Sequence, residues 1–328
     1  MIIPVFLVFA GFVALIFGAN WLVDGSSALA KKYNVSDLVI GLTIVAFGTS
    51  APELVVNSIA SIQGHSDIVL GNIIGSNNFN LFIILGISGL IYPIKVQTST
   101  AWKEIPISLF ISILLLLLLN DFVFEGITSS SRMDGMIMLV LFFFFLYYVF
   151  KQIKQEPQGI ENTEQKSAFK ILTLIIVGIG GLVLGGQLVV VNSIKIANIL
   201  GVSEKIIGLT IVAAGTSLPE LVTSVVAATK KNSDIAIGNV IGSNIFNILL
   251  ILSLSSILHP INYNSKFNLD LFILIGGTIF LLSSMWTGER KKLDRWEAGV
   301  LFMLYHLSCY ARSIMLAIKI ESSFLIRN

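Results

Sequence analysis

The sequence predicts an all-α polytopic membrane protein, with ten transmembrane helices arranged as two inverted five-helix repeats. Three observations indicate this fold class. Of the 328 residues, 55% are hydrophobic and only 12% are charged, which is about half the charge of a typical soluble domain. The apolar residues form runs close to the ~20 residues that span a bilayer. Finally, one stretch of the chain occurs twice.

Ten apolar runs follow one another along the chain, and each is long enough to be a membrane-spanning helix. They cover residues 3–30, 35–62, 69–93, 104–120, 133–150, 167–196, 204–229, 236–258, 268–286 and 297–318. A polar stretch at 151–166 separates them into two sets of five. We interpret residues 1–150 and 167–328 as the two repeats, and residues 151–166 as a cytoplasmic connector.

The Lys and Arg residues are unevenly distributed between the two sides of the predicted membrane. With the N-terminus outside, the inner loops hold 14 of these residues and the outer loops hold five. Basic residues favour the cytoplasmic side, so we expect both termini outside and a multi-pass location in the cell membrane. The first apolar run lacks a charged leader and a cleavage site, so we expect it to be retained as a span.

The repeated stretch is the strongest pattern in the sequence. Residues 41–80 align with residues 208–247 at a constant offset of 167, with 25 identities in 40 positions and no gap. Each half has an odd number of spans, so the second copy must cross the membrane in the opposite sense. Inverted repeats of this kind place substrate sites near the bilayer midplane, at the interface between the repeats.

Each copy carries one acidic residue, Glu53 or Glu220, inside an apolar run. A carboxylate at membrane depth is costly and indicates an ion or substrate site. Pro52 and Pro219 lack an N–H group and clash with the carbonyl four residues earlier, so we expect each helix to break there and to free backbone carbonyls. The carbonyls and hydroxyls expected near the breaks belong to Ala46–Gly48, Thr49, Ser50, Ala213–Gly215, Thr216 and Ser217.

The following helix of each half supplies a second polar stripe. Ser76 and Asn80 are four residues apart and share one helix face, and Ser243 and Asn247 repeat this spacing. We favour ion coordination for these four residues, and hydrogen bonding between helices for Asn72 and Asn239. Oxygen ligands without His or Cys suit hard cations such as Ca²⁺ and Na⁺. The single cysteine, Cys309, and three scattered histidines indicate neither a disulfide nor a metal cluster.

The segments GTSAPE and GTSLPE, each followed by GNxIGSNxFN, resemble the two α-repeats of the sodium/calcium exchanger family, within the cation/Ca²⁺ exchanger superfamily. The resemblance implies an antiporter rather than an enzyme, with Ca²⁺ and Na⁺ as substrates in a lipid bilayer. It implies no cofactor, no nucleic acid and no obligate protein partner. It also implies a core of four broken helices, the second, third, seventh and eighth, across which the first and sixth slide to alternate access.

Position by position, the resemblance makes Glu53 and Glu220 the central acids shared by Ca²⁺ and Na⁺. It assigns one Na⁺ site to Thr49, Ser50, Ser76 and the Ala46 carbonyl, its symmetry mate to Thr216, Ser217, Ser243 and the Ala213 carbonyl, and the middle of the ring to Asn80 and Asn247. Archaeal-type members of the family and the K⁺-dependent branch often carry Asp where this chain has Asn247. The missing carboxylate argues against K⁺ co-transport.

The leading hypothesis is exchange of several Na⁺ for one Ca²⁺, which would make Ca²⁺ extrusion electrogenic. The nearest alternative is exchange of H⁺ for Ca²⁺, or transport of another divalent cation, because two carboxylates can also carry protons. A hydrolase using Ser50 or Ser217 as nucleophile would need a His or Lys base, and the sequence places none near either serine. A channel would not need paired, inverted breaks.

Overall fold

The computed structural model describes residues 2–120, 129–152, 167–201, 213–287 and 291–307. Within these residues, seven helices are long and apolar enough to cross a membrane, and a bent pair makes an eighth. The seven are Ile2–Tyr33 (α1), Ser66–Ile91, Thr100–Leu119, Arg132–Gln152 (α8), Ala168–Ile199 (α9), Ser233–Leu258 and Ser265–Ser284. The chain is therefore an all-α polytopic membrane protein.

Several spans contain more than one type of helical turn. Ser66–Ile91 consists of α5 (Ser66–Asn78), η2 (Phe79–Ile84) and α6 (Leu85–Ile91), and Ser233–Leu258 consists of α13 (Ser233–Phe246), η5 (Asn247–Leu252) and α14 (Ser253–Leu258). Thr100–Leu119 joins η3 (Thr100–Glu104) to α7 (Ile105–Leu119), and Ser265–Ser284 joins η6 (Ser265–Phe267) to α15 (Asn268–Ser284). The segments η2, η3 and η5 are π-helical, whereas η6 is a 3₁₀ turn.

The bent pair is the second expected span. It runs through α2 (Asp37–Ile40), η1 (Gly41–Val45) and α3 (Ala46–Thr49), and bends by 48° into α4 (Ala51–Ile62). Its counterpart in the second half is described as α11 (Ala213–Thr216) and α12 (Leu218–Thr229). The rest of the expected span 204–229 lies outside the described residues, as does most of the connector 151–166.

The tenth expected span is described as a helix over residues 295–307. Residues 308–318 of that span lie outside the described part of the chain, so the ten-helix arrangement stays a prediction. The expectation of breaks in the third and eighth helices was wrong. Ser66–Ile91 and Ser233–Leu258 are continuous, because neither contains proline and a π-helical segment keeps its backbone N–H groups bonded five residues back.

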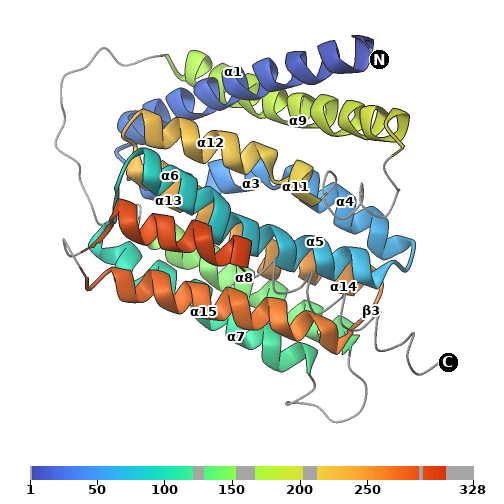
Figure 1. Cartoon of the computed structure of the whole chain (residues 1–328). Helices are drawn as coiled ribbons and strands as arrows, with labels where there is room; N and C mark the ends of the chain where they lie inside the picture. The colour runs from blue at the N-terminus through green and yellow to red at the C-terminus, as the bar shows by residue number, and fades with distance from the viewer. Residues whose placement is uncertain (1, 121–128, 153–166, 202–212, 288–290, 308–328) are drawn as a thin grey trace.

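Two long helices, α1 and α9, lie side by side along one edge of the molecule, away from α7 and α15 (Figure 1). Their contact is made by glycines. A Cβ at Gly11 would lie 2.8 Å from the carbonyl oxygen of Gly185, and a Cβ at Gly18 would lie 2.9 Å from that of Gly178. Small residues let membrane helices approach this closely. The pairing makes the two helices antiparallel, and the offset of 167 relates Gly11 to Gly178 and Gly18 to Gly185.

Two short strand pairs join the halves. The strand β1 (Ile94–Lys95) pairs antiparallel with β4 (Lys292–Leu293), and β2 (Ser129–Ser130) pairs antiparallel with β3 (Ile261–Asn262). The offset of 167 also relates β1 to β3. Each half therefore contributes one strand to each pair, and the two halves are interlocked at both pairs.

The helices with the repeated polar stripe lie at the centre of the fold. In the apolar part of Ser233–Leu258, 94% of residues are buried, compared with 22% for α1. Close backbone approach makes this packing possible, because a Cβ at Gly238 would lie 3.0 Å from the carbonyl oxygen of Leu38. The central position removes Ser243 and Asn247 from lipid, since both are buried.

Candidate functional site

The helix breaks occur at Ser50 and Ser217, one residue before the helices that carry the two acids. Ser50 has φ −85° and ψ 5°, and Ser217 has φ −89° and ψ 8°. Pro52 and Pro219 then lie in the first turn of α4 and α12. Backbone N–H groups in a first turn have no partner within the helix, so the missing N–H of proline breaks no hydrogen bond there. This placement confirms the expected breaks and puts Glu53 and Glu220 in the first turn of the following helices.

One detail of the expected break was wrong. The Ala46 carbonyl is not freed, because α3 continues to Thr49 before the chain bends. It accepts the backbone N–H of Ser50 at 3.0 Å and lies 3.3 Å from the hydroxyl oxygen of Thr49. Ala213, its counterpart, is the first described residue of α11.

Each break serine contacts the acid of the opposite half. The Oγ atom of Ser50 lies 2.9 Å from Oε1 of Glu220 and 3.0 Å from Oγ of Ser243. The offset of 167 relates these contacts to a second set, in which Oγ of Ser217 lies 3.4 Å from Oε1 of Glu53 and 3.0 Å from Oγ of Ser76. The two acids and their four serine neighbours thus form two equivalent clusters, each built from both halves.

The threonines beside the breaks are held by the asparagines that we expected to join helices. The Thr49 hydroxyl donates to Oδ1 of Asn239 at 3.0 Å, and the Thr216 hydroxyl donates to Oδ1 of Asn72 at 3.2 Å. Asn239 also donates its amide hydrogens to the Glu220 carbonyl at 3.3 Å and to Ser224 Oγ at 2.9 Å. The expectation of hydrogen bonding between helices is confirmed for both asparagines.

Four oxygen atoms of the expected ligand residues are buried without a hydrogen-bond partner. They are Oε2 of Glu53, Oε2 of Glu220, Oδ1 of Asn80 and Oδ1 of Asn247, each from a side chain that is 1% exposed. A buried polar atom without a partner costs free energy, because it has lost its bonds to water. Carboxylate and amide oxygens bind hard cations well, so a bound Ca²⁺ or Na⁺ would satisfy the same atoms.

Charge at the site comes from the two acids. Their carboxyl groups are close enough to interact electrostatically, and each keeps only one oxygen hydrogen bonded to a serine. Among the described residues, no three His, Cys, Asp or Glu side chains come together in a metal-binding group. A cation here would therefore be bound by two carboxylates together with neutral hydroxyl and amide oxygens.

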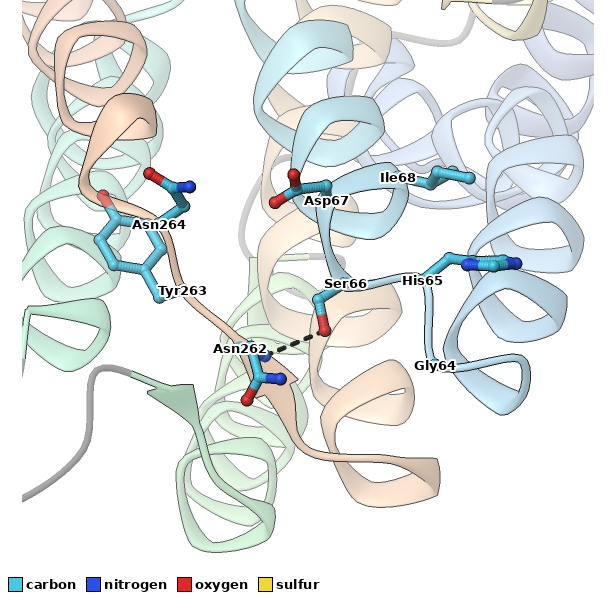
Figure 2. A pocket seen from close by; sticks show the side chains of 8 residues that line it. All are labelled: Gly64, His65, Ser66, Asp67, Ile68, Asn262, Tyr263 and Asn264. Atoms are coloured by element: carbon cyan, nitrogen blue, oxygen red, sulfur yellow. Dashed lines mark hydrogen bonds between the residues drawn. The ribbon is translucent and has the colours of Figure 1, made fainter.

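Two surface pockets among the described residues lie away from the acids and their serine neighbours. One, of about 430 Å³, is lined by Gly64–Ile68 and Asn262–Asn264 at the start of α5 (Figure 2), where Ser66 Oγ accepts the N–H of Asn262 at 3.0 Å. The other, of about 350 Å³, includes Lys230–Asp234 at the start of α13. The offset of 167 relates the two pockets, which therefore mark the corresponding ends of the central helices.

Sequence reasoning missed two asparagines, Asn77 and Asn244, that hydrogen bond to the expected ligands Asn247 and Asn80. Their hydrogen-bond partners are distant in sequence and could not be predicted, but their position in the repeat is itself a signal. In the two copies of GSNxFN, this asparagine is identical, whereas the next residue changes from Asn78 to Ile245.

Comparison with known proteins places these observations in a family. The family model described as "Sodium/calcium exchanger protein" matches residues 3–151 and 170–314. The chain is 36% identical to the sodium/calcium exchanger MaX1 of Methanosarcina acetivorans, over 90% of this chain and 94% of that protein. It is 32% identical to the inner membrane protein YrbG of Escherichia coli, over 79% and 81% respectively.

Solved structures of a sodium-calcium exchanger have the same fold as this chain. A structure of the sodium-calcium exchanger NCX_Mj, soaked with Na⁺ and Sr²⁺, superposes with a TM-score of 0.83 at 34% identity, covering 94% of this chain and 98% of that one. Another structure of NCX_Mj, soaked with Na⁺ and Ca²⁺, has a TM-score of 0.82. Given its two family-model matches, its paired acids and its fold, the chain belongs to the sodium/calcium exchanger family of membrane transporters.

Proposed function

We propose that the protein is a secondary antiporter that exchanges Na⁺ for Ca²⁺ at one shared site near the bilayer midplane. The observation that carries this proposal is the set of four buried, unpartnered oxygens on Glu53, Glu220, Asn80 and Asn247. Two carboxylates supply the charge that one Ca²⁺ neutralises, and amide oxygens complete a hard-ligand set. The Na⁺ and Ca²⁺ named for MaX1 and NCX_Mj support the same ions.

The proposed ligands extend from the two acids along both helices of each half. They are Glu53, Glu220, Thr49, Ser50, Ser76, Asn80, Thr216, Ser217, Ser243 and Asn247, with the carbonyl of Ala213 and, in exchange for its contact with the Thr49 hydroxyl, the carbonyl of Ala46. The cross-contacts of Ser50 with Glu220 and of Ser217 with Glu53 support one shared site, because neither half could form it without the other. Several Na⁺ would replace one Ca²⁺ at these oxygens.

Alternating access would follow from movement of α1 and α9 over the other helices. The glycine contacts between these two helices support this part of the proposal, because they couple α1 to α9 through backbone atoms. The two helices would then move as one body. We also propose that the protein lies in the cell membrane with both termini outside, in keeping with the inner-membrane location of YrbG.

Flux measurements in proteoliposomes test the function. Vesicles loaded with Na⁺ and diluted into Na⁺-free buffer should take up radioactive Ca²⁺. If more than two Na⁺ leave for each Ca²⁺, an inside-positive potential set with K⁺ and valinomycin should accelerate uptake. No uptake above that of empty vesicles, with protein shown to be folded by its thermal unfolding, would refute the proposal.

The same vesicles test H⁺/Ca²⁺ exchange, the alternative that two carboxylates also support. For this test, the Na⁺ gradient is replaced by a pH gradient with an acidic interior, and Na⁺ is omitted on both sides. Ca²⁺ uptake under these conditions would favour proton coupling. We expect uptake to require Na⁺ inside the vesicle and, without valinomycin, to be independent of K⁺ outside it.

A further inference from the structure

Two buried asparagines, Asn77 and Asn244, lie beside the proposed ligands without belonging to them. Their side chains are 0% and 3% exposed, and the offset of 167 relates one to the other. Both lie on the central helices, three residues before Asn80 and Asn247 respectively. All four hydrogen bonds described below pass between the two halves of the molecule.

The orientation of the Asn77 side chain is fixed by a backbone group. Its Nδ2 atom donates to the carbonyl oxygen of Asn244 at 3.2 Å. A carbonyl can only accept, so the amide nitrogen of Asn77 must face it. The Oδ1 atom of Asn77 is thereby directed to Asn247, whose Nδ2 donates to it at 2.9 Å.

This contact decides which end of the Asn247 amide remains free. Because its nitrogen is bonded to Asn77, its Oδ1 is the atom left buried without a partner. The second half repeats the arrangement. Asn244 Nδ2 donates to the Asn77 carbonyl at 3.3 Å, Asn80 Nδ2 donates to Asn244 Oδ1 at 3.0 Å, and Asn80 Oδ1 is left without a partner.

We propose that Asn77 and Asn244 are positioning residues that present the amide oxygens of Asn247 and Asn80, rather than their NH₂ groups, to the transported cation. An Asn side chain can bind a cation through oxygen only, and a flipped amide would place two N–H donors against it. The inference rests on the proposed function, since it takes Ca²⁺ or Na⁺ as the ligand. These hydrogen bonds orient the amide oxygens of Asn247 and Asn80, which neither Glu53 nor Glu220 contacts in this way.

The main alternative is that these asparagines only hold helices together. Asparagine can orient a neighbouring amide because its own side chain carries an NH₂ donor and an oxygen acceptor on one planar group. A hydrogen bond to the NH₂ group on one side therefore directs the oxygen to the other side. A purely structural residue would affect unfolding but not cation affinity. Ca²⁺ affinity and thermal stability must therefore be measured on the same variants.

The test uses the full-length protein, purified in detergent, with Ca²⁺ as the probe. In Asn77→Ala, the Asn247 amide loses the contact that fixes it, and we expect the Ca²⁺ Kd to rise up to about tenfold, because a hydrogen bond between neutral amides contributes about 0.5–1.5 kcal/mol. Asn78→Ala is the matched control. Asn78 is adjacent, 4% exposed, and donates to a carbonyl outside the site, that of Asp270, at 3.0 Å. The Ca²⁺ Kd of Asn78→Ala should stay within about twofold of the wild-type value.

Two further variants separate orientation from stability. In Asn77→Asp, the carboxyl group keeps an oxygen that accepts from the Asn247 amide, so Ca²⁺ affinity should be largely restored relative to Asn77→Ala. In the double variant Asn77→Ala with Asn247→Ala, the Kd should be no higher than in Asn247→Ala, because Asn77 acts through Asn247. Asn244→Ala tests the symmetric pair if Asn77→Ala does not fold.

Equal Ca²⁺ affinity in Asn77→Ala and Asn78→Ala would overturn the positioning role while leaving the exchanger function intact. Additive losses in the double variant would also overturn it. A wild-type protein that is folded but binds neither Ca²⁺ nor Na⁺ would overturn both this inference and the proposed function, so the two failures are distinguishable.

Discussion

Replacing either buried acid by its amide tests the charge argument directly. Glu53→Gln keeps the size of the side chain and an Oε1 acceptor for Ser217, but it removes one negative charge and turns the unpartnered Oε2 into an NH₂ group. Two unit charges about 4 Å apart interact by about 4 kcal/mol at the effective dielectric constant of protein sites, and the double charge of Ca²⁺ makes the interaction larger. Ca²⁺ affinity should therefore fall by at least roughly a thousandfold.

The folded state should tolerate this change. The Ser217 contact can persist, and the repulsion between the carboxyl groups of Glu53 and Glu220 is removed. We therefore expect the unfolding temperature without Ca²⁺ to stay the same or rise, while the stabilisation that Ca²⁺ gives the wild-type protein is lost. Thermal unfolding with and without Ca²⁺, combined with Na⁺-driven Ca²⁺ uptake, measures both effects.

A buried glutamate outside the site provides the control. Glu104 is 0% exposed and accepts hydrogen bonds from Tyr148 at 2.5 Å and from Gln152 at 2.7 Å. Glu104→Gln should retain Ca²⁺ uptake, whereas Glu53→Gln and Glu220→Gln should abolish it. Retained Na⁺-dependent uptake in both site variants would refute the reasoning that these two charges bind the cation.

Three other predictions concern the middle of the site, the α1–α9 contact and the topology. Asn247→Asp adds a charge and loses the donor to Asn77, so cation preference should change; unchanged Na⁺ and K⁺ dependence of Ca²⁺ uptake would show that the residue is not a ligand. Gly185→Ala places a Cβ 2.8 Å from the Gly11 carbonyl and should lower the unfolding temperature, at a cost of about 1–3 kcal/mol. Gly180→Ala, which meets nothing within 4 Å, should be neutral, and equal unfolding temperatures would contradict the packing argument. An N-terminal epitope tag should be accessible to antibody in spheroplasts without permeabilisation, and detection only after permeabilisation would reverse the topology.

Much of the site could be predicted because its cause is local in sequence. Proline ends helical hydrogen bonding wherever it occurs, so the breaks beside Glu53 and Glu220 follow from Pro52 and Pro219. The internal repeat then implied that the two breaks meet. The contacts of Ser50 and Ser217 with the acids of the opposite halves agree with that reasoning.

The remaining features depend on partners that are distant in sequence. The breaks expected in the third and eighth helices are instead π-helical segments beginning at Phe79 and Asn247, for which no proline or other local signal exists. The role of Asn77 depends on the Asn244 carbonyl, 167 residues away, and adjacent asparagines look alike until that partner is known. The Ala46 carbonyl was expected to be free, but Pro52 removes only the N–H that would bond to Gly48, and the N–H of Ser50 still bonds to Ala46.

The pairing of strands between the two halves has a consequence for biogenesis. During synthesis, β1 at Ile94–Lys95 leaves the ribosome long before its partner β4 at Lys292–Leu293, and β2 must likewise wait for β3. The N-terminal half therefore enters the membrane with its strands unpaired and with Glu53 lacking the Ser217 hydroxyl. Synthesis of the second half, rather than insertion of the first, is therefore the event that assembles the proposed cation site, and a chain truncated before it would carry Glu53 without its Ser217 partner.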